Sequence, residues 1–160
     1  MSHQQHSTKG FTLLEVLLVV AAIAILAGIA IFAINPGKQL AELRNAKREA
    51  DVSLIVNALY QYALDNNGSF PEDIVAEPDS NCENYVDDEI CQSDIAMQTC
   101  GVALVELTAN QKYLVSVPVD PSGGINGADG AGYYVHMNEN GRIVACAPNA
   151  ELDREIKVIR

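Results

Sequence analysis

A single carboxylate lies in the longest apolar stretch of the sequence. Residues 11–34 contain two polar side chains, Thr12 and Glu15, and Glu15 carries the only charge. A charge inside a membrane helix costs roughly 2.5–3.5 kcal/mol on insertion scales, so it usually marks a functional position. If the chain is cut after Gly10, the new α-amino group on Phe11 lies about one helical turn from Glu15. The two groups can also pair between neighbouring helices and give their packing a register.

Four cysteines follow this apolar stretch: Cys82, Cys91, Cys100 and Cys146. They form no CxxC pair, and that part of the chain contains one histidine, which argues against a zinc site. An even number of cysteines beyond a membrane segment favours two disulfides in an oxidising compartment. Of the three possible pairings we predict Cys82 with Cys91 and Cys100 with Cys146. The alternative is reduced, buried cysteines.

A glycine-rich loop carries several oxygen ligands. Asp120, Ser122, Asn126 and Asp129 lie within ten residues among glycines. Hard cations such as Ca²⁺ bind carboxylate and carbonyl oxygens supplied by loops that can wrap around them. Calcium is therefore a candidate ligand of these four residues. The alternative is a flexible loop in a head domain that its disulfides stabilise instead.

The sequence offers no set of nucleophile, base and orienting group. The GxSxG, HExxH and phosphate-loop patterns are absent. His136 falls in a predicted strand, where a histidine is more often packed or solvated than catalytic. We therefore expect the protein not to be an enzyme.

The charge distribution argues against nucleic acid as a direct partner. The net charge is −11, and no Lys or Arg occurs between Arg48 and Lys112. Binding to phosphates needs clustered basic side chains, which this chain lacks. Residues 72–94 hold nine acidic side chains, and such a run indicates a solvated surface.

Helical segments must position these groups. Residues 11–34 are long enough to cross a bilayer as a helix. Gly28, Pro36 and Gly37 weaken the helix, and we predict a kink there because the helical pattern resumes at once. The alternative is a loop that ends the membrane helix. We expect a second, amphipathic half to pack on the head domain through apolar residues at helical spacing: Leu40, Leu43, Ala46, Ala50, Val52, Ile55, Val56, Leu59, Tyr62 and Ala63.

The rest of the chain predicts a small head domain, so the fold class is α+β. Asn138–Gly141 has the residues of a turn and lies between two predicted strands, which indicates an antiparallel hairpin. We expect the long helix to pack by its second half on an antiparallel sheet of three or more strands. The expected elements are an acidic loop over residues 69–99, a short helix or strand over 102–108, an extended segment over 113–121, and strands over 132–137, 142–147 and 155–160.

The start of the chain resembles a known targeting signal. The run Lys9-Gly10-Phe11-Thr12-Leu13-Leu14-Glu15-Val16 is similar to the class III signal of type IV prepilins and type II secretion pseudopilins. The resemblance implies cleavage between Gly10 and Phe11 by a membrane prepilin peptidase, with N-methylation of Phe11. It also implies that Glu15, with Thr12 beside it, serves filament assembly by contacting the N-terminus of a neighbouring subunit.

The resemblance also implies an architecture and a function. A pilin fold would comprise a leader (1–10), a transmembrane and assembly helix (11–34), an amphipathic half (35–68) and an extracytoplasmic head (69–160). The expected role is a structural subunit, held in the cytoplasmic membrane and then stacked with copies of itself and other pilins into a filament. A prepilin peptidase, an assembly platform protein and a cytoplasmic ATPase would be its partners.

Two choices stay open at this level. The Tyr113–Pro121 stretch resembles pseudopilins, in whose major members a loop near residues 120–129 binds calcium, whereas the cysteines resemble those of surface pili. A different class is a monomeric binding domain held by an uncut signal-anchor, which would retain residues 1–10.

Overall fold

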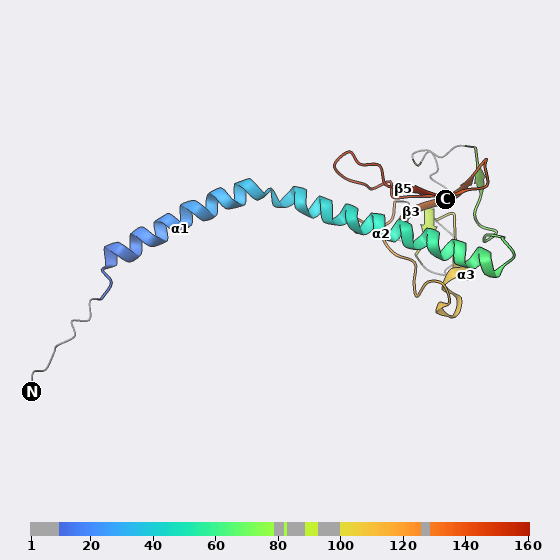
Figure 1. The fold of residues 1–160 in the computed structure, drawn as a ribbon, viewed down its shortest axis with the longest axis horizontal. Helices are drawn as coiled ribbons and strands as arrows, with labels where there is room; N and C mark the ends of the chain where they lie inside the picture. The colour runs from blue at the N-terminus through green and yellow to red at the C-terminus, as the bar shows by residue number, and fades with distance from the viewer. Residues whose placement is uncertain (1–9, 79–81, 83–88, 93–99, 126–128) are drawn as a thin grey trace, which may run out of the picture. The chain divides into compact units, whose positions relative to one another are not determined.

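The computed structural model describes residues 10–78, 82, 89–92, 100–125 and 129–160, which include one long apolar helix and a small sheet. The chain divides into two compact units, Met1–Gln39 and Leu40–Arg160. The two long helices precede the strands, and no strand–helix–strand alternation runs through the described sheet, so the predicted α+β class is confirmed. The elements are α1 (Leu13–Ile34), α2 (Pro36–Asp65), β1 (Ala76–Glu77), β2 (Glu89–Cys91), α3 (Val105–Thr108), the 3₁₀ turn η2 (Ala109–Gln111), β3 (Gly130–Asn138), β4 (Ile143–Cys146) and β5 (Lys157–Ile159) (Figure 1).

Helix α1 is apolar on all sides. Its segment Leu13–Ala33 is long and apolar enough to cross a membrane. The described side chains of α1 are exposed. A helix that is apolar on all sides is unfavourable in water, because its whole surface would be exposed. It is therefore suited to lipid or to packing against other apolar helices.

The interruption between the two helices is confined to Asn35. This residue adopts a left-handed conformation, with φ 44° and ψ 75°. Pro36 disfavours the helical conformation in the residue before it, and Asn tolerates the left-handed region better than most residues. Asn35 also caps α2, because its Oδ1 atom and its carbonyl accept from the Lys38 amide at 3.3 and 3.1 Å. The helical path is therefore interrupted at Asn35, directly before Pro36, where the kink was predicted. No break occurs at Gly28, which lies inside α1.

Helix α2 buries one face against the head domain (Figure 1). Val52, Ile55 and Leu59 have no exposed surface and belong to the main core. Full burial of an aliphatic side chain contributes about 1.5–3 kcal/mol, so this stripe is a large part of what holds the helix to the sheet. The buried positions follow helical spacing: Ala41, Asn45, Arg48, Val52, Ile55, Val56, Ala58, Leu59 and Ala63.

The first turns of α2 differ from the prediction. Four apolar residues that were expected to face the head are exposed: Leu40, Leu43, Ala46 and Ala50. At this level the inner face carries the polar side chains of Asn45 and Arg48, both without exposed surface. The apolar positions lie on the opposite side of the helix, and the polar ones find partners in head loops. Hydrophobic spacing therefore indicated the wrong inner face at this end of α2.

Strand β3 is the centre of the sheet. It pairs antiparallel with β4, which pairs antiparallel with β5, so the three strands predicted near the C-terminus are present. One face of β3 carries Tyr133 and Val135, which share the main core with α2. The other face carries Tyr134, which clusters with Cys82 and Cys146. The sheet is therefore covered by α2 on one side, and Cys82 packs on the other.

Two short strands complete the described sheet. Strand β2 pairs antiparallel with β3. Strand β1 is parallel to β3, with Ala76 opposite Met137, so the sheet is mixed and not antiparallel throughout as predicted. The segment predicted as a short helix or strand contains α3, and its first residue, Val102, bridges to Ile90 of β2. Strands β1 and β2 both fall within residues 69–99, which the sequence predicted as an acidic loop.

The predicted disulfide pairing is wrong. The structure joins Cys82 to Cys146 and Cys91 to Cys100. The Cys91 amide donates to the Val102 carbonyl at 2.8 Å, and this pairing brings residues 100–102 alongside β2. Cys146 lies on the face of β4 that Cys82 covers. The pairing of residues 100–102 with β2 thus brings Cys100 to Cys91, and the packing of Cys82 on β4 brings it to Cys146.

The two disulfides should differ in their contribution to stability. Cys82–Cys146 spans 64 residues and Cys91–Cys100 spans 9. In the chain-entropy model these loops contribute about 4 and about 2.5 kcal/mol respectively. We expect Cys82→Ala/Cys146→Ala to lower the free energy of unfolding more than Cys91→Ala/Cys100→Ala. Urea unfolding of the full chain in detergent measures both variants, and equal losses would contradict the loop-size argument.

Candidate functional site

The start of α1 places Glu15 in a defined position. Thr12 is the N-cap, with φ −79° and ψ 149°, and its Oγ1 atom accepts from the Glu15 amide at 3.2 Å. The spacing from Thr12 to Glu15 is that of a capping box. A carboxylate in the first helical turn is also favoured by the helix dipole. Thr12, which the sequence analysis placed in assembly, therefore acts as a cap in this structure.

The Glu15 side chain has no cationic partner among the described residues. The carboxylate lies on an exposed, otherwise apolar turn, and Phe11 before it is 83% exposed. Gly10 is exposed as well, and a side chain placed there would meet nothing within 4 Å. The segment that the sequence analysis assigned to processing is thus open on all sides, while Lys9 lies outside the described residues.

Residues 5–31 match a family model described as the prokaryotic N-terminal methylation motif. The matched segment agrees with the resemblance to the class III signal of type IV prepilins. Its match includes Gly10, Phe11, Thr12 and Glu15, the four residues whose geometry is described above. No curated protein and no solved structure gives a significant match to the chain. The class III signal implies processing by a prepilin peptidase, and it agrees with an N-terminal helix that is suited to a membrane.

The residues proposed for calcium are used differently by the structure. Arg48 of α2 donates to Asp120 from Nε (to Oδ2, 2.6 Å) and from Nη2 (to Oδ1, 3.1 Å), and Nη2 also donates to Ser122 Oγ at 2.8 Å. Two of the four predicted ligands, Asp120 and Ser122, thus accept hydrogen bonds from a guanidinium in this structure. Asn126 lies outside the described residues, and the Asp129 carbonyl accepts from the Gln92 amide. Among the residues described, no three His, Cys, Asp or Glu gather as metal ligands.

The guanidinium of Arg48 has further partners in the C-terminal loop. Its Nη1 atom donates to Asn45 Oδ1 and to Glu151 Oε2, both at 2.9 Å. Arg44 also binds Glu151, with Nε and Nη2 donating at 2.7 and 2.6 Å. These contacts lower the pKa of Glu151 to about 2, mainly through the hydrogen bonds from Arg44 and then those from Arg48. We call Asn45, Arg48, Asp120, Ser122 and Glu151 the Arg48 cluster.

The Arg48 cluster was not predicted from the sequence, although the helical spacing of its residues on α2 indicated that they are buried. Asn45 and Arg48 continue the helical spacing of Ala41 and Val52, which are both buried. A polar residue on the buried stripe of a helix must find a hydrogen-bonding partner, because an unpaired buried charge is very unfavourable. The position of Asn45 and Arg48 on the buried face of α2 therefore predicts acidic or amide side chains elsewhere in the chain that bind them. Which residues those are depends on contacts across 72 and 103 residues.

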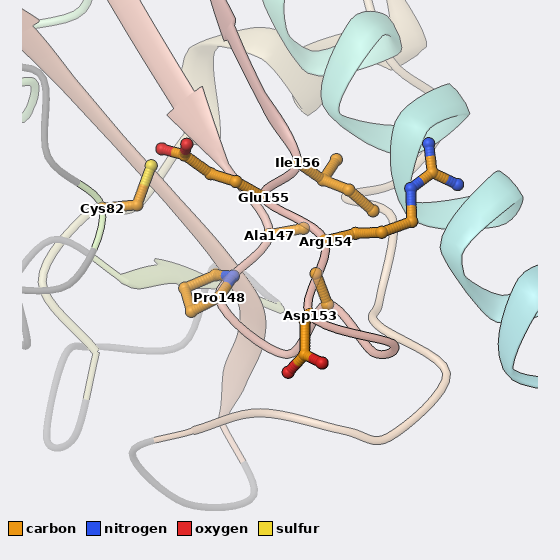
Figure 2. A pocket seen from close by; sticks show the side chains of 8 residues that line it. Cys82, Ala147, Pro148, Asp153, Arg154, Glu155 and Ile156 are labelled. Atoms are coloured by element: carbon orange, nitrogen blue, oxygen red, sulfur yellow. The ribbon is translucent and has the colours of Figure 1, made fainter.

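A hollow of about 500 Å³ lies beside the C-terminal loop (Figure 2). Its charged side chains diverge: Asp153 and Glu155 point in different directions, and Arg154 extends toward α2, where it pairs with Glu49. Leu152 and Asp153 both have positive φ, so the loop turns sharply at this point. The lining charges do not converge on one point, and they therefore do not assemble a catalytic or ligand-binding group. The lining residues are Cys82, Ala147, Pro148, Ala150, Asp153, Arg154, Glu155 and Ile156.

The lowered pKa of Glu151 predicts a pH dependence of stability. Its ordinary value is 4.5, so the charged carboxylate stabilises the fold above that pH and the stabilisation is lost as pH falls toward 2. We expect the melting temperature of the full chain in detergent to fall across this range. Glu151→Gln should melt lower at neutral pH and show a flatter profile below pH 4.5. Glu155→Gln is the control, because Glu155 pairs with the exposed Lys157 only and should keep the wild-type profile.

Proposed function

We propose that the mature protein is a structural subunit of a type IV pilus-like or type II secretion pseudopilus filament, assembled through α1. One observation carries the proposal. A single carboxylate lies on the capped first turn of an otherwise apolar helix, within the segment that matches the N-terminal methylation motif. The proposed role of Glu15 is to form an ion pair. No covalent bond needs to be made or broken after processing.

The environment of Glu15 favours assembly over permanent residence in lipid. In hydrocarbon a carboxylate is unfavourable by several kcal/mol unless it is paired. Cleavage after Gly10 creates an amine on Phe11, and a neighbouring α1 can bring its own amine to the Glu15 carboxylate. The apolar sides of α1 then pack on other copies of α1. Assembly therefore moves the Glu15 carboxylate out of lipid and pairs it with the Phe11 amine of a neighbouring copy in the same step.

The exposed side of α2 supports self-association as well. Leu43 and Leu54 are 66% and 47% exposed, and they lie on the side away from the head core. With Ala46 and Ala50 they form a solvent-facing apolar row at helical spacing, which we call the outer stripe. Contiguous exposed apolar surface commonly marks an interaction site. The partner we infer is a second copy of this chain, because the outer stripe belongs to the helix that continues directly from the assembly helix.

The proposal also assigns a location. Helix α1 would hold the subunit in the cytoplasmic membrane before assembly, with the head on the extracytoplasmic side. Two disulfides in the head agree with an oxidising compartment. A platform protein and a cytoplasmic ATPase would drive extraction from the membrane, since the described residues of the chain bring no nucleotide-binding motif to the task.

Replacing Glu15 tests the proposed function. Glu15→Leu should leave membrane insertion and leader cleavage intact, because both depend on apolarity and on the residues around Gly10. It should abolish assembly or reduce it by at least tenfold, because the amine of the neighbour loses its partner. Sheared filament fractions report assembly, and intact mass reports processing of the same protein.

The control for this experiment is Glu106→Leu, the same substitution at an exposed position of α3. It should assemble like wild type. Normal filaments from Glu15→Leu would disprove the pairing role. Retention of Met1–Gly10 in a peptidase-competent cell would instead support the uncut signal-anchor and overturn the filament subunit altogether.

The outer stripe makes an independent prediction. Leu43→Glu places a charge on the stripe without touching the head core, so the melting temperature should change by only about 1–2 °C while filament yield falls severalfold. Val115→Glu is the matched control, because Val115 is 75% exposed and lies outside the stripe. Equal filament yields from the two variants would contradict a role of the stripe in packing.

A further inference from the structure

Five oxygen atoms converge on the guanidinium of Arg48. They belong to Asp120 (two carboxylate oxygens), Ser122, Asn45 and Glu151, and each accepts a hydrogen bond at 2.6–3.1 Å. They come from α2, from the loop after Pro118 and from the loop after Pro148. Two carboxylates and two neutral oxygens around one positive charge form the kind of ligand set that a hard cation takes in a protein.

The position of this charge makes it costly to remove. Arg48 and Asp120 have no exposed side-chain surface, whereas Glu151 is one-third exposed. Taking one partner from a buried ion pair leaves the other charge desolvated and unpaired, which destabilises by about 3–5 kcal/mol. Arg44 cannot take over, because among the described residues its guanidinium binds Glu151 and not Asp120, and it is partly exposed. Asp120 therefore depends on Arg48 for its neutralisation.

The cluster also joins the loops to the helix. The Ser122 backbone amide donates to Asp120 Oδ1 at 2.7 Å. The same carboxylate that binds Arg48 therefore also holds the backbone of the turn that contains Ser122. Asn45 exchanges hydrogen bonds with the Glu151 backbone at 2.7 and 3.0 Å. One cation thus holds two loops on the first turns of α2, where the apolar core does not reach.

We propose that Arg48 is the built-in cation of the head domain. It occupies the place that a calcium ion would need if Asp120 and Ser122 were metal ligands, and it ties the same loop to α2. The head therefore folds and stays folded without a divalent metal. The inference concerns the head alone, so it holds or fails independently of filament assembly.

The first experiment uses the full wild-type chain in detergent, with its disulfides oxidised. The melting temperature should be the same in excess chelator and in millimolar calcium, because the oxygens already bind a cation. A lower melting temperature in chelator would overturn the proposal, whatever happens to the variants.

The second experiment removes the guanidinium. Arg48→Ala should lower the melting temperature by about 10 °C or more. Arg44→Ala is the matched control on the same helix and should cost a few degrees, because its pair is partly exposed. Arg48→Lys keeps a point charge without the planar fork, so its melting temperature should lie between those of wild type and Arg48→Ala.

Calcium distinguishes a cation site from simple packing. Millimolar calcium should raise the melting temperature of Arg48→Ala and leave that of wild type and Arg44→Ala unchanged, because only the first variant frees the oxygens. The double variant Arg48→Ala/Asp120→Ala should not respond to calcium. If Arg48→Ala is as stable as Arg44→Ala, or folds but ignores calcium, the five oxygens are not a cation site and the proposal is wrong. If Arg48→Ala does not fold, Arg48→Lys and the wild-type chelator result decide it.

Discussion

The buried pairing of Arg48 with Asp120 fixes the polar part of the inner face of α2 to the head, next to the apolar stripe. Both side chains are fully buried, and they join the helix to a loop 72 residues away. Further along α2, apolar residues such as Val52 and Leu59 make the contact with the sheet. The helix therefore uses charge at its start and hydrophobic burial at its middle. The apolar core therefore contacts α2 from Val52 onward, while the hydrogen bonds of Arg48 hold the preceding part of the helix to the head.

The same helix must serve two environments. Its inner face satisfies Asn45 and Arg48 with head-domain oxygens, whereas its outer stripe leaves Leu43 and Leu54 facing outward. Ahead of it, α1 offers apolar side chains all round and one carboxylate, Glu15. Polar groups are thus placed where a specific partner exists or is created by processing, and the remaining surface is apolar. That division is what a subunit needs if it leaves a membrane for a filament.

The head achieves its stability with a small core and covalent support. Its main cluster lies between α2 and one face of the sheet, and a smaller cluster on the other face includes the Cys82–Cys146 disulfide. Domains of this size bury a modest share of their surface, so cross-links and a buried ion pair add what the core lacks. The two disulfides and the buried Arg48–Asp120 ion pair all lie within Leu40–Arg160 and do not involve the N-terminal motif.

Local features of this protein followed from the sequence alone. The apolar helix, the processing motif around Gly10 and the hairpin of β3 and β4 depend on neighbours a few residues apart, so spacing and residue type were enough. The disulfide pairing, the polar inner face of α2 and the use of Asp120 by Arg48 were decided by the tertiary structure. They join residues 64 or more positions apart, apart from the short Cys91–Cys100 bond, which β2 pairing selects. Periodicity shows that a residue lies on a face, but only the fold brings that face its partner.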